Sequence, residues 1–330
     1  MVEKAVELFH QMPRFNCERS LQSFNTLLNV LVANERFFDA NDLFGRSKEL
    51  GLRPNAVSFN IMMKGWLGKG ELENACQVFD EMLEREVQPT VVTYNSLIGF
   101  LCRRGEVDKA VRLFDDTTRK GHHPNAITYA LLMEGLCSFS RYDEAKKVMF
   151  DMEYRGCKPK LINFGVLMTD LAQRGKFDEA ESLLLEMKKK KLKPDAVIYN
   201  ILVNFLCKRR RAEDAYKVLV EMQMKGCEPN AATYRMLVDG FCQVDEYERA
   251  LSVLHAMLMS RHCPQIKSFN CLVVGLLKRG KIDDACFVLE EMEKRNMRLQ
   301  LALWETLVED VCGTNHAPHE LVSELVSSSF

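Results

Sequence analysis

The 330-residue sequence predicts an all-α fold, a superhelical α-solenoid of stacked helix–turn–helix repeats. Three observations predict it: an alanine recurs every 35 residues, an aromatic residue recurs at the same interval, and no insertion or deletion interrupts the spacing. A single helical hairpin cannot bury its apolar stripe alone, so repeats of this size must stack on one another. One elongated array therefore replaces the two domains that the length would ordinarily suggest.

The 35-residue period is visible in three columns of apolar residues. The alanines lie at positions 5, 40, 75, 110, 145, 180, 215, 250 and 285. The aromatic residues are Phe24, Phe59, Tyr94, Tyr129, Phe164, Tyr199, Tyr234, Phe269 and Trp304. A methionine column runs from Met12 to Met292, with Ser47 and Thr117 as its exceptions. We expect all three columns to be buried between helices, the alanines where two helices approach most closely.

Each repeat is predicted to contain two helices of about thirteen residues. In the unit 91–125, apolar residues follow the i, i+3, i+4, i+7 spacing of one helical face from Tyr94 to Leu101. Gly105 breaks this first helix, and Pro124 follows the end of the second.

Eight full units and two atypical ends divide the chain. The units are 21–55, 56–90, 91–125, 126–160, 161–195, 196–230, 231–265 and 266–300. Residues 1–20 align with only the second helix of a unit, and 301–330 are expected to form a degenerate ninth repeat with a C-terminal cap. A start at a bare second helix suggests that the natural array extends further upstream.

Composition and cysteine usage exclude several classes of protein. The chain is 47% apolar and 28% charged, and it has no run of 18 apolar residues, so we expect a soluble globular protein without a membrane span. No transit peptide is visible at the acidic start. The twelve cysteines form no C-x-x-C pair, and five share one phase of the repeat, which predicts free thiols in a reducing compartment and no metal. These five are Cys102, Cys137, Cys207, Cys242 and Cys312.

Catalytic motifs are also missing from the sequence. There is no H-x-E with a following C-x-x-C, no aspartate cluster of the kind that nucleases use, and no glycine-rich phosphate loop. We therefore predict a protein that is not an enzyme and binds no cofactor.

The units resemble the pentatricopeptide repeat family, specifically its plain 35-residue class (P-class). The segments Val92–Ile98, Asp178–Ala180, Glu221–Met222 and Lys225–Asn230 carry the resemblance. A strict period of 35, with proline second from last, favours this family over the 34-residue tetratricopeptide repeat. The resemblance implies a right-handed superhelix that binds single-stranded RNA with one base per repeat.

In that family the fifth and last residues of a repeat select the base, and the second residue sandwiches it. Four fifth/last pairs resemble the pyrimidine-reading combinations: Asn25/Asn55, Asn60/Thr90, Asn95/Asn125 and Asn200/Asn230. Four others depart from the family code, although Asn270 remains a candidate base contact: Ala130/Lys160, Gly165/Asp195, Arg235/Gln265 and Asn270/Gln300. The implied stacking residues are Val57, Val92, Ile127, Ile162 and Val197.

The chemistry of asparagine leaves two interpretations of the fifth position open. Its amide can present a donor or an acceptor to a base edge, and we then expect Asn60, Asn95 and Asn200 to be exposed. Alternatively, these residues are N-terminal helix caps. The periodic asparagine at the last position favours base reading, although turns also favour asparagine.

Basic and acidic residues are distributed unevenly between the two helices of each repeat. Positions 1–14 of the eight units hold 11 basic and 3 acidic residues, a net of +8 on a chain whose total is −1, which leaves −9 elsewhere. A positive wall of first helices would suit a phosphate backbone. Arg103, Lys208 and Lys278 occupy the thirteenth position, where the family contacts phosphate; alternatively, they are solvated cations favoured at helix C-termini.

The leading prediction is an RNA-binding adaptor of the mitochondrion or, alternatively, the chloroplast, with a pyrimidine-rich target. It would stabilise, process or help translate particular transcripts as a monomer, with organellar ribosomes or RNA-processing proteins as further partners. The competing prediction is a structural or protein-binding scaffold, such as an organellar ribosome component, that reads no sequence.

Overall fold

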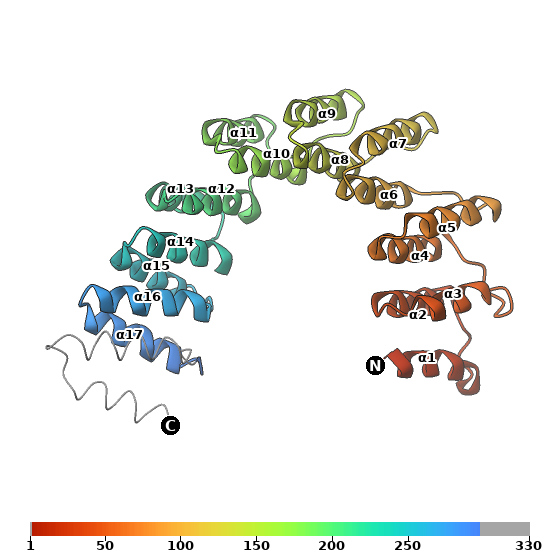
Figure 1. Cartoon of the computed structure of the whole chain (residues 1–330), viewed down its shortest axis with the longest axis horizontal. Helices are drawn as coiled ribbons and strands as arrows, with labels where there is room; N and C mark the ends of the chain where they lie inside the picture. The colour runs from red at the N-terminus through yellow and green to blue at the C-terminus, as the bar shows by residue number, and fades with distance from the viewer. Residues whose placement is uncertain (1, 298–330) are drawn as a thin grey trace. The chain divides into compact units, whose positions relative to one another are not determined.

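The computed structural model describes residues 2–297, and every regular element within them is a helix (Figure 1). The predicted ninth repeat and cap at 301–330 and the last residue of the eighth unit, Gln300, lie outside the described residues. Trp304 and Cys312, the last members of their columns, lie outside them as well.

Eight helical hairpins follow the N-terminal helix α1 (Val2–Gln11) and the short 3-10 helix η1 (Met12–Phe15). Their first helices are α2 (Leu21–Ala33), α4 (Ala56–Lys69), α6 (Val91–Arg103), α8 (Ala126–Ser138), α10 (Leu161–Gln173), α12 (Ala196–Lys208), α14 (Ala231–Gln243) and α16 (Ile266–Lys278). Their second helices are α3 (Phe37–Gly45), α5 (Leu72–Glu84), α7 (Val107–Arg119), α9 (Tyr142–Tyr154), α11 (Phe177–Lys189), α13 (Ala212–Met224), α15 (Tyr247–Met259) and α17 (Ile282–Glu293). Each first helix begins at position one of its predicted unit.

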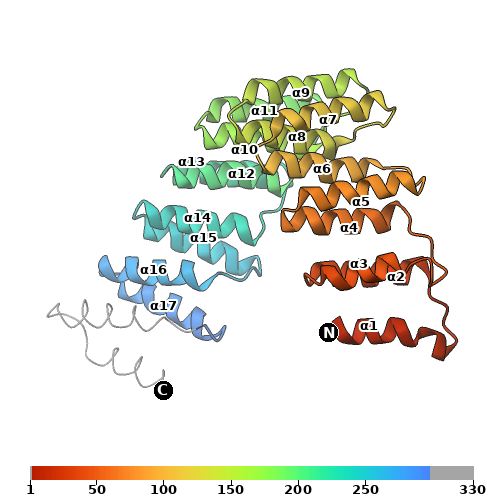
Figure 2. The same cartoon turned by 45° about the vertical axis from the view of Figure 1, so that its right-hand side comes forward.

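The chain divides into two compact units, residues 1–170 and 171–330, and the division falls within α10. In the first unit, α2 packs on α4, α4 on α6 and α6 on α8, while each second helix packs on the first helix of its own hairpin. The second unit repeats this pattern with α12, α14 and α16 (Figure 2). These contacts confirm the predicted all-α solenoid of stacked helical hairpins.

The two turns of each repeat explain why the period never varies. Position 15, between the paired helices, has a positive φ in every repeat, from Gly70 at 88° to Arg210 at 59°. Position 31, after the second helix, does the same, for example at Gly121 with a φ of 81°. Glycine enters this left-handed region without steric cost. Because both turns are closed by one residue in the same conformation, each hairpin has a fixed length.

The predicted core columns are buried within the eight hairpins, whereas Ala5 and Met12 before them are partly buried. Ala110 and Met82 are fully buried, and Tyr94 and Leu97 are at most 8% exposed. All eight alanines from Ala40 to Ala285 have at most 1% of their surface exposed, so two helices meet at each of them with no room for a larger side chain.

Buried cysteines pack between first helices as small apolar residues. A methyl group added at Gly135 would lie 2.4 Å from Sγ of Cys102, and one added at Gly240 would lie 2.5 Å from Sγ of Cys207. Each of these pairs joins position 12 of one repeat to position 10 of the next. All cysteines among the described residues are free thiols. The small size of both partners lets consecutive first helices approach closely.

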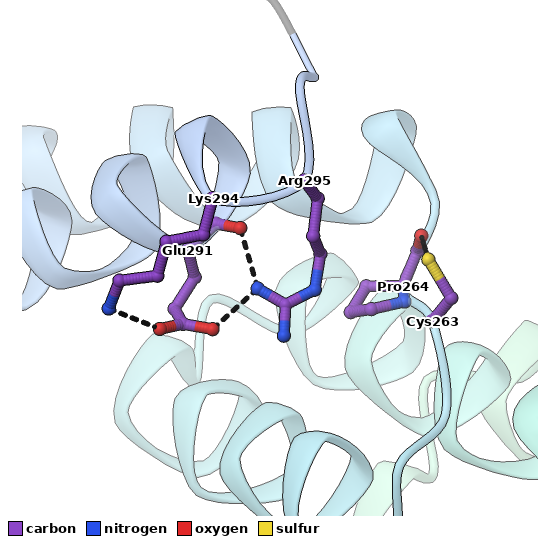
Figure 3. A network of polar contacts seen from close by, with 5 residues as sticks. All are labelled: Cys263, Pro264, Glu291, Lys294 and Arg295. Carbon is purple, nitrogen blue, oxygen red and sulfur yellow. Dashed lines mark hydrogen bonds and ion pairs between the residues drawn. The ribbon is translucent and has the colours of Figure 1, made fainter.

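A compact ion-pair network ends the described part of the array (Figure 3). The carboxylate of Glu291, whose side chain is 13% exposed, accepts from Lys294 Nζ at 2.8 Å and from Arg295 Nη1 at 2.5 Å. The same Arg295 nitrogen also donates to the main-chain oxygen of Glu291 at 2.7 Å. The bonds from Lys294 and then Arg295 lower the pKa of the Glu291 carboxyl. The bond from Arg295 thus gives a donor to a main-chain oxygen in the last turn of α17.

Candidate nucleic-acid interface

The second position of five consecutive repeats exposes an aliphatic side chain. These side chains are between 48% and 63% exposed, although the neighbouring positions three and four of the same helical turn are buried. They are Val57, Val92, Ile127, Ile162 and Val197. β-Branched residues in this position offer a flat apolar surface to a ligand. The residues predicted to stack on bases are therefore accessible.

The last residue of a repeat is the N-cap of the next first helix. Asn55 Oδ1 accepts from the main-chain nitrogens of Val57 and Ser58 at 3.0 and 3.2 Å. Asn125 and Asn230 make the corresponding bonds in their repeats. Side-chain acceptors at this position satisfy donors that the helix leaves unpaired. The helix-cap interpretation that the sequence left open for the fifth position is therefore wrong, because the caps lie one residue before position one.

The fifth residue lies inside the first helix and contacts the last residue of its own repeat. Asn200 Nδ2 donates to Asn230 Oδ1 at 3.2 Å, and Asn60 Nδ2 lies 3.4 Å from Thr90 Oγ1. Fifth and last residues of one repeat are thus brought together across 30 positions of sequence. Each such pair places two polar groups beside an exposed aliphatic residue.

The expected exposure of the fifth position is wrong for Asn60. Asn60 and Asn270 are each 8% exposed, whereas Asn25, Asn95 and Asn200 are half-buried. For Asn60 the cause is the packing of α6 on α4, which covers the side chain. Within residues 2–297, the Oδ1 atoms of Asn60, Asn95 and Asn270 are buried and have no hydrogen-bond partner. A buried acceptor without a donor is costly, so no internal hydrogen bond favours the inward position of these three oxygens.

A pocket of about 480 Å³ opens between α2 and α4. Its lining includes the second residues of the first two repeats, Gln22 and Val57. Asn25 and Asn55, the fifth and last residues of the first repeat, line the same pocket. An apolar surface and two amides thus surround one space, which can hold a flat ring with polar edge atoms.

The three cations predicted to contact phosphate are exposed. Arg103, Lys208 and Lys278 lie in the last turns of α6, α12 and α16, and none forms an ion pair with a carboxylate within residues 2–297. Lys208 Nζ lies 5.4 Å from the ring centroid of Phe205. Cations elsewhere are often paired between second helices, as Arg141 is with Asp108 at 2.7 Å. The thirteenth position therefore keeps charge available for an anion.

Three of the four repeats that depart from the family pattern present no comparable group. Ala130 is buried, Gly165 has no side chain, and Arg235 Nε donates to the Ala231 carbonyl of its own helix at 3.1 Å. At the last position, Lys160 is exposed and Asp195 caps α12 through Ile198. Repeats four, five and seven therefore lack a fifth-position amide.

Sequence reasoning missed the third position of each repeat. It holds a buried polar residue in six of the repeats, each at most 1% exposed. These are Ser58, Thr93, Thr128, Asn163, Thr233 and Ser268. Ser58 Oγ donates to Asn25 Oδ1 and Thr233 Oγ1 to Asn200 Oδ1, both at 2.6 Å. The strict spacing of serine and threonine at this position is the signal that could have revealed the column.

Two further features were searched for within the described residues. No group of three or more histidine, cysteine or acidic side chains there has the arrangement of a metal site. No described helix combines the length and the apolar character that a bilayer crossing requires.

The fold and the repeated polar surface define a helical-hairpin repeat protein of the solenoid class. Models described as "PPR repeat family" match residues 54–103, 89–138 and 194–243, and "Pentatricopeptide repeat domain" matches 7–69 and 164–209. "PPR repeat" matches 127–157, 232–262 and 267–297. The chain belongs to the pentatricopeptide repeat family.

Curated relatives match over short segments. A mitochondrial pentatricopeptide repeat-containing protein of Arabidopsis thaliana is 56% identical over 56 residues, which is 17% of this chain and 12% of that protein. A second mitochondrial member from the same plant is 44% identical over 54 residues, 16% of this chain and 10% of its own length. The matched segments thus span about a tenth of these relatives.

Solved structures show the same fold over almost the whole chain. The pentatricopeptide repeat protein PPR10 from maize aligns with a TM-score of 0.59 at 20% identity, covering 99% of this chain and 56% of that one. PPR10 in complex with an 18-nucleotide psaJ RNA element aligns with a TM-score of 0.54 at 22% identity, with the same coverage. At this identity the likeness concerns the fold alone.

Proposed function

We propose that this chain is a sequence-selective adaptor for single-stranded RNA, in which each plain 35-residue repeat contacts one base. The observation that carries the proposal is the pocket between α2 and α4, where Asn25 and Asn55 lie beside Val57. The aliphatic surface supports a stacked base, and the amides hydrogen-bond to its edge. The unpaired cations at the thirteenth position neutralise the backbone phosphates.

The target is pyrimidine-rich and the compartment is the mitochondrion. Repeats one, two, three and six carry the pyrimidine-type pairs, so the bound RNA, followed 5′ to 3′ along the chain, has the pattern YYY-n-n-Y. The mitochondrial designation of two relatives supports this compartment over the chloroplast. An adaptor of this kind acts without catalysis, by protecting a transcript or by exposing it for processing or translation.

Base preference at the third repeat tests the proposal most sharply. Replacing Asn95 with Thr exchanges an amide for a hydroxyl while Asn125 stays in place, and a Thr/Asn pair resembles the family's adenine-reading combination. A correct hydrogen-bonded match is worth ~1–3 kcal/mol per base. Selection from a random pool first identifies the bound sequence. Oligonucleotides of that sequence that differ only at the base of the third repeat should then reverse their order of affinity, by about tenfold, between the wild type and Asn95→Thr. Fluorescence anisotropy measures the dissociation constants.

Asn41→Thr is the matched control, because Asn41 is an exposed asparagine on the second helix α3. It should leave every base preference unchanged. If selection enriches no motif and all four bases bind equally before and after Asn95→Thr, the chain is a scaffold, such as an organellar ribosome component, and the proposal fails.

Removing the thirteenth-position cations should weaken binding without changing base preference. We expect the triple variant Arg103→Gln, Lys208→Gln and Lys278→Gln to flatten the log–log salt dependence by about 0.7 per lost contact, or about 2 in total. Titration of binding against salt measures this slope. Arg112→Gln, Lys146→Gln and Lys189→Gln together remove as much charge from second helices and should leave the slope nearly intact. A changed base preference in the first triple would refute the assigned role.

A further inference from the structure

We propose that the hydroxyl at the third position of the following repeat fixes the orientation of the fifth-position amide, which makes Ser58 and Thr233 specificity-determining positioning residues. The proposal rests on the proposed function, because it concerns which atoms of Asn25 and Asn200 face a base. Under this proposal, the residues that select one base come from two consecutive repeats.

The contacts at the junction of repeats six and seven leave the amide one orientation. Thr233 is fully buried, and its Oγ1 donates to Asn200 Oδ1 at 2.6 Å. The same oxygen accepts the main-chain N–H of Asn230 at 3.2 Å, and it lies closer to Asn200 Oδ1 than to its other acceptor, Asn230 Oδ1, at 3.1 Å. Asn200 Nδ2 donates one hydrogen to Asn230 Oδ1 at 3.2 Å. A flip of the amide would break both of its bonds.

The junction of repeats one and two has the same construction. Ser58 is fully buried, and Ser58 Oγ donates to Asn25 Oδ1 at 2.6 Å while accepting the main-chain N–H of Asn55 at 3.2 Å. Asn25 and Asn55 line the pocket between α2 and α4. The oxygen of the Asn25 amide is thus occupied from within the protein, and its Nδ2 hydrogens are the groups left for a base.

A fixed donor distinguishes the two pyrimidines. Cytosine carries an acceptor at N3, whereas uracil carries a hydrogen there, so the two bases present opposite patterns at the same ring position. An amide locked with Nδ2 outwards matches cytosine, and an amide free to flip matches either base. Repeats one and six should therefore prefer cytosine to uracil.

Repeat three lacks this lock although it has the same residues. Thr128 Oγ1 donates to its own cap, Asn125 Oδ1, at 3.2 Å, and makes no bond to Asn95. Asn95 Oδ1 is buried and has no hydrogen-bond partner within residues 2–297, so no internal bond opposes a flip of the amide that turns this oxygen outwards to accept the N3–H of uracil. Thr233 and Thr128 share their burial and their bonds to the cap, and they differ in the contact with the fifth residue. They form a matched pair.

The test compares Thr233→Ala with Thr128→Ala in the full chain. Dissociation constants are measured for oligonucleotides with cytosine or uracil at the base of repeat six or of repeat three. We expect the wild type to prefer cytosine at repeat six by about tenfold and Thr233→Ala to bring that ratio close to one. Thr128→Ala should leave the ratio at repeat three unchanged. Thr233→Ser keeps the hydroxyl and should restore the preference.

The outcomes separate this inference from the proposed function. Both alanine variants lose the same capping bonds, so equal shifts in their urea midpoints show that folding is matched. If the wild type discriminates at repeat six and Thr233→Ala discriminates equally well, the positioning role is refuted and base reading stands. If the wild type shows no base preference at any repeat, the proposed function fails together with this inference.

Discussion

Two junctions of the array use the same backbone arrangement for opposite purposes. Between repeats six and seven, the amide of Asn200 is half-buried on the first helix and is contacted by Thr233. Between repeats four and five, the fifth residue is Ala130, and the amide stands instead at the third position of the next repeat, as the fully buried Asn163. The first arrangement keeps an amide at the surface, and the second places it in the core.

The buried amide at the second junction serves the fold. Asn163 Nδ2 donates to the main-chain oxygen of Ala126 at 2.9 Å, and its Oδ1 accepts the N–H of Lys160 at 3.0 Å. One side chain thereby links two first helices and caps its own. The comparison teaches that a polar third residue serves both junctions, whereas the size of the fifth residue decides whether an amide remains for a ligand.

The largest effect expected from this comparison is on stability. Asn163→Ala removes the buried bond to the Ala126 carbonyl, leaves the N–H of Lys160 without a side-chain acceptor and opens a cavity, so the free energy of unfolding should fall by about 2–4 kcal/mol. Asn200→Ala removes a half-buried amide and should cost about 1 kcal/mol or less. Urea unfolding followed by circular dichroism measures both. Equal losses would contradict the division between a structural and a ligand-facing amide.

The apolar framework was predictable from the sequence because burial must recur with the repeat. Every hairpin needs a small residue at the Ala110 position and a large ring at the Tyr94 position, and both requirements leave a period of 35. The polar contacts were not predictable in the same way. Ser58 and Asn25 lie 33 positions apart, and the bond between them depends on how closely α2 and α4 pack.

The candidate site was therefore predicted in part. The column at Val57 and the cations at the thirteenth position were located by applying the repeat positions of the resembling family to the 35-residue period, and both are exposed. The burial of Asn60 did not, because it results from the neighbouring helix covering the side chain. Thr233 was also missed, since a threonine in the first helical turn is indistinguishable from an ordinary capping-box residue in sequence.

A single substitution should disrupt the close packing of α12 and α14 between repeats six and seven. Gly240→Ala would place a methyl group 2.5 Å from Sγ and 2.8 Å from Cβ of Cys207, so overpacking should lower the free energy of unfolding by about 1–3 kcal/mol. Cys207→Ala in the same chain removes the obstructing sulfur but keeps the Cβ, so it should recover part of this loss, which a double-mutant cycle measures.

Gly68→Ala is the control for the intrinsic effect of alanine in a helix. A methyl group at Gly68 of α4 meets nothing within 4 Å, and this glycine has no positive φ. The substitution should be neutral or stabilising by up to about 1 kcal/mol. A Gly240→Ala chain as stable as Gly68→Ala would show that the contact between repeats six and seven is loose, and that the Thr233–Asn200 bond is not enforced by packing.

The ion-pair network at Glu291 adds a third region to the comparison. Its loss should have the smallest effect on the free energy of unfolding. The bonds from Lys294 and Arg295 hold the pKa of Glu291 below its ordinary value of ~4.3 (Figure 3). A carboxyl whose folded-state pKa is depressed contributes stability above its unfolded pKa and loses it as the pH falls through the folded value. Glu291→Gln should therefore cost about 1 kcal/mol or less at pH 7, and the difference from the wild type should vanish near pH 3.

Thermal unfolding at pH 7 and pH 3 measures this difference, and Glu293→Gln, at an exposed carboxylate on the same helix, is its control. The small size follows from the solvent exposure of the partners, since the Lys294 side chain is 61% exposed and the Arg295 side chain 29%. The Asn163 side chain is fully buried, so it is largely free of this screening, and an amide does not titrate. If Glu291→Gln lowered the free energy of unfolding as much as Asn163→Ala does, and equally at both pH values, Glu291 would act through packing. Burial of the polar atoms would then not determine the order of these effects.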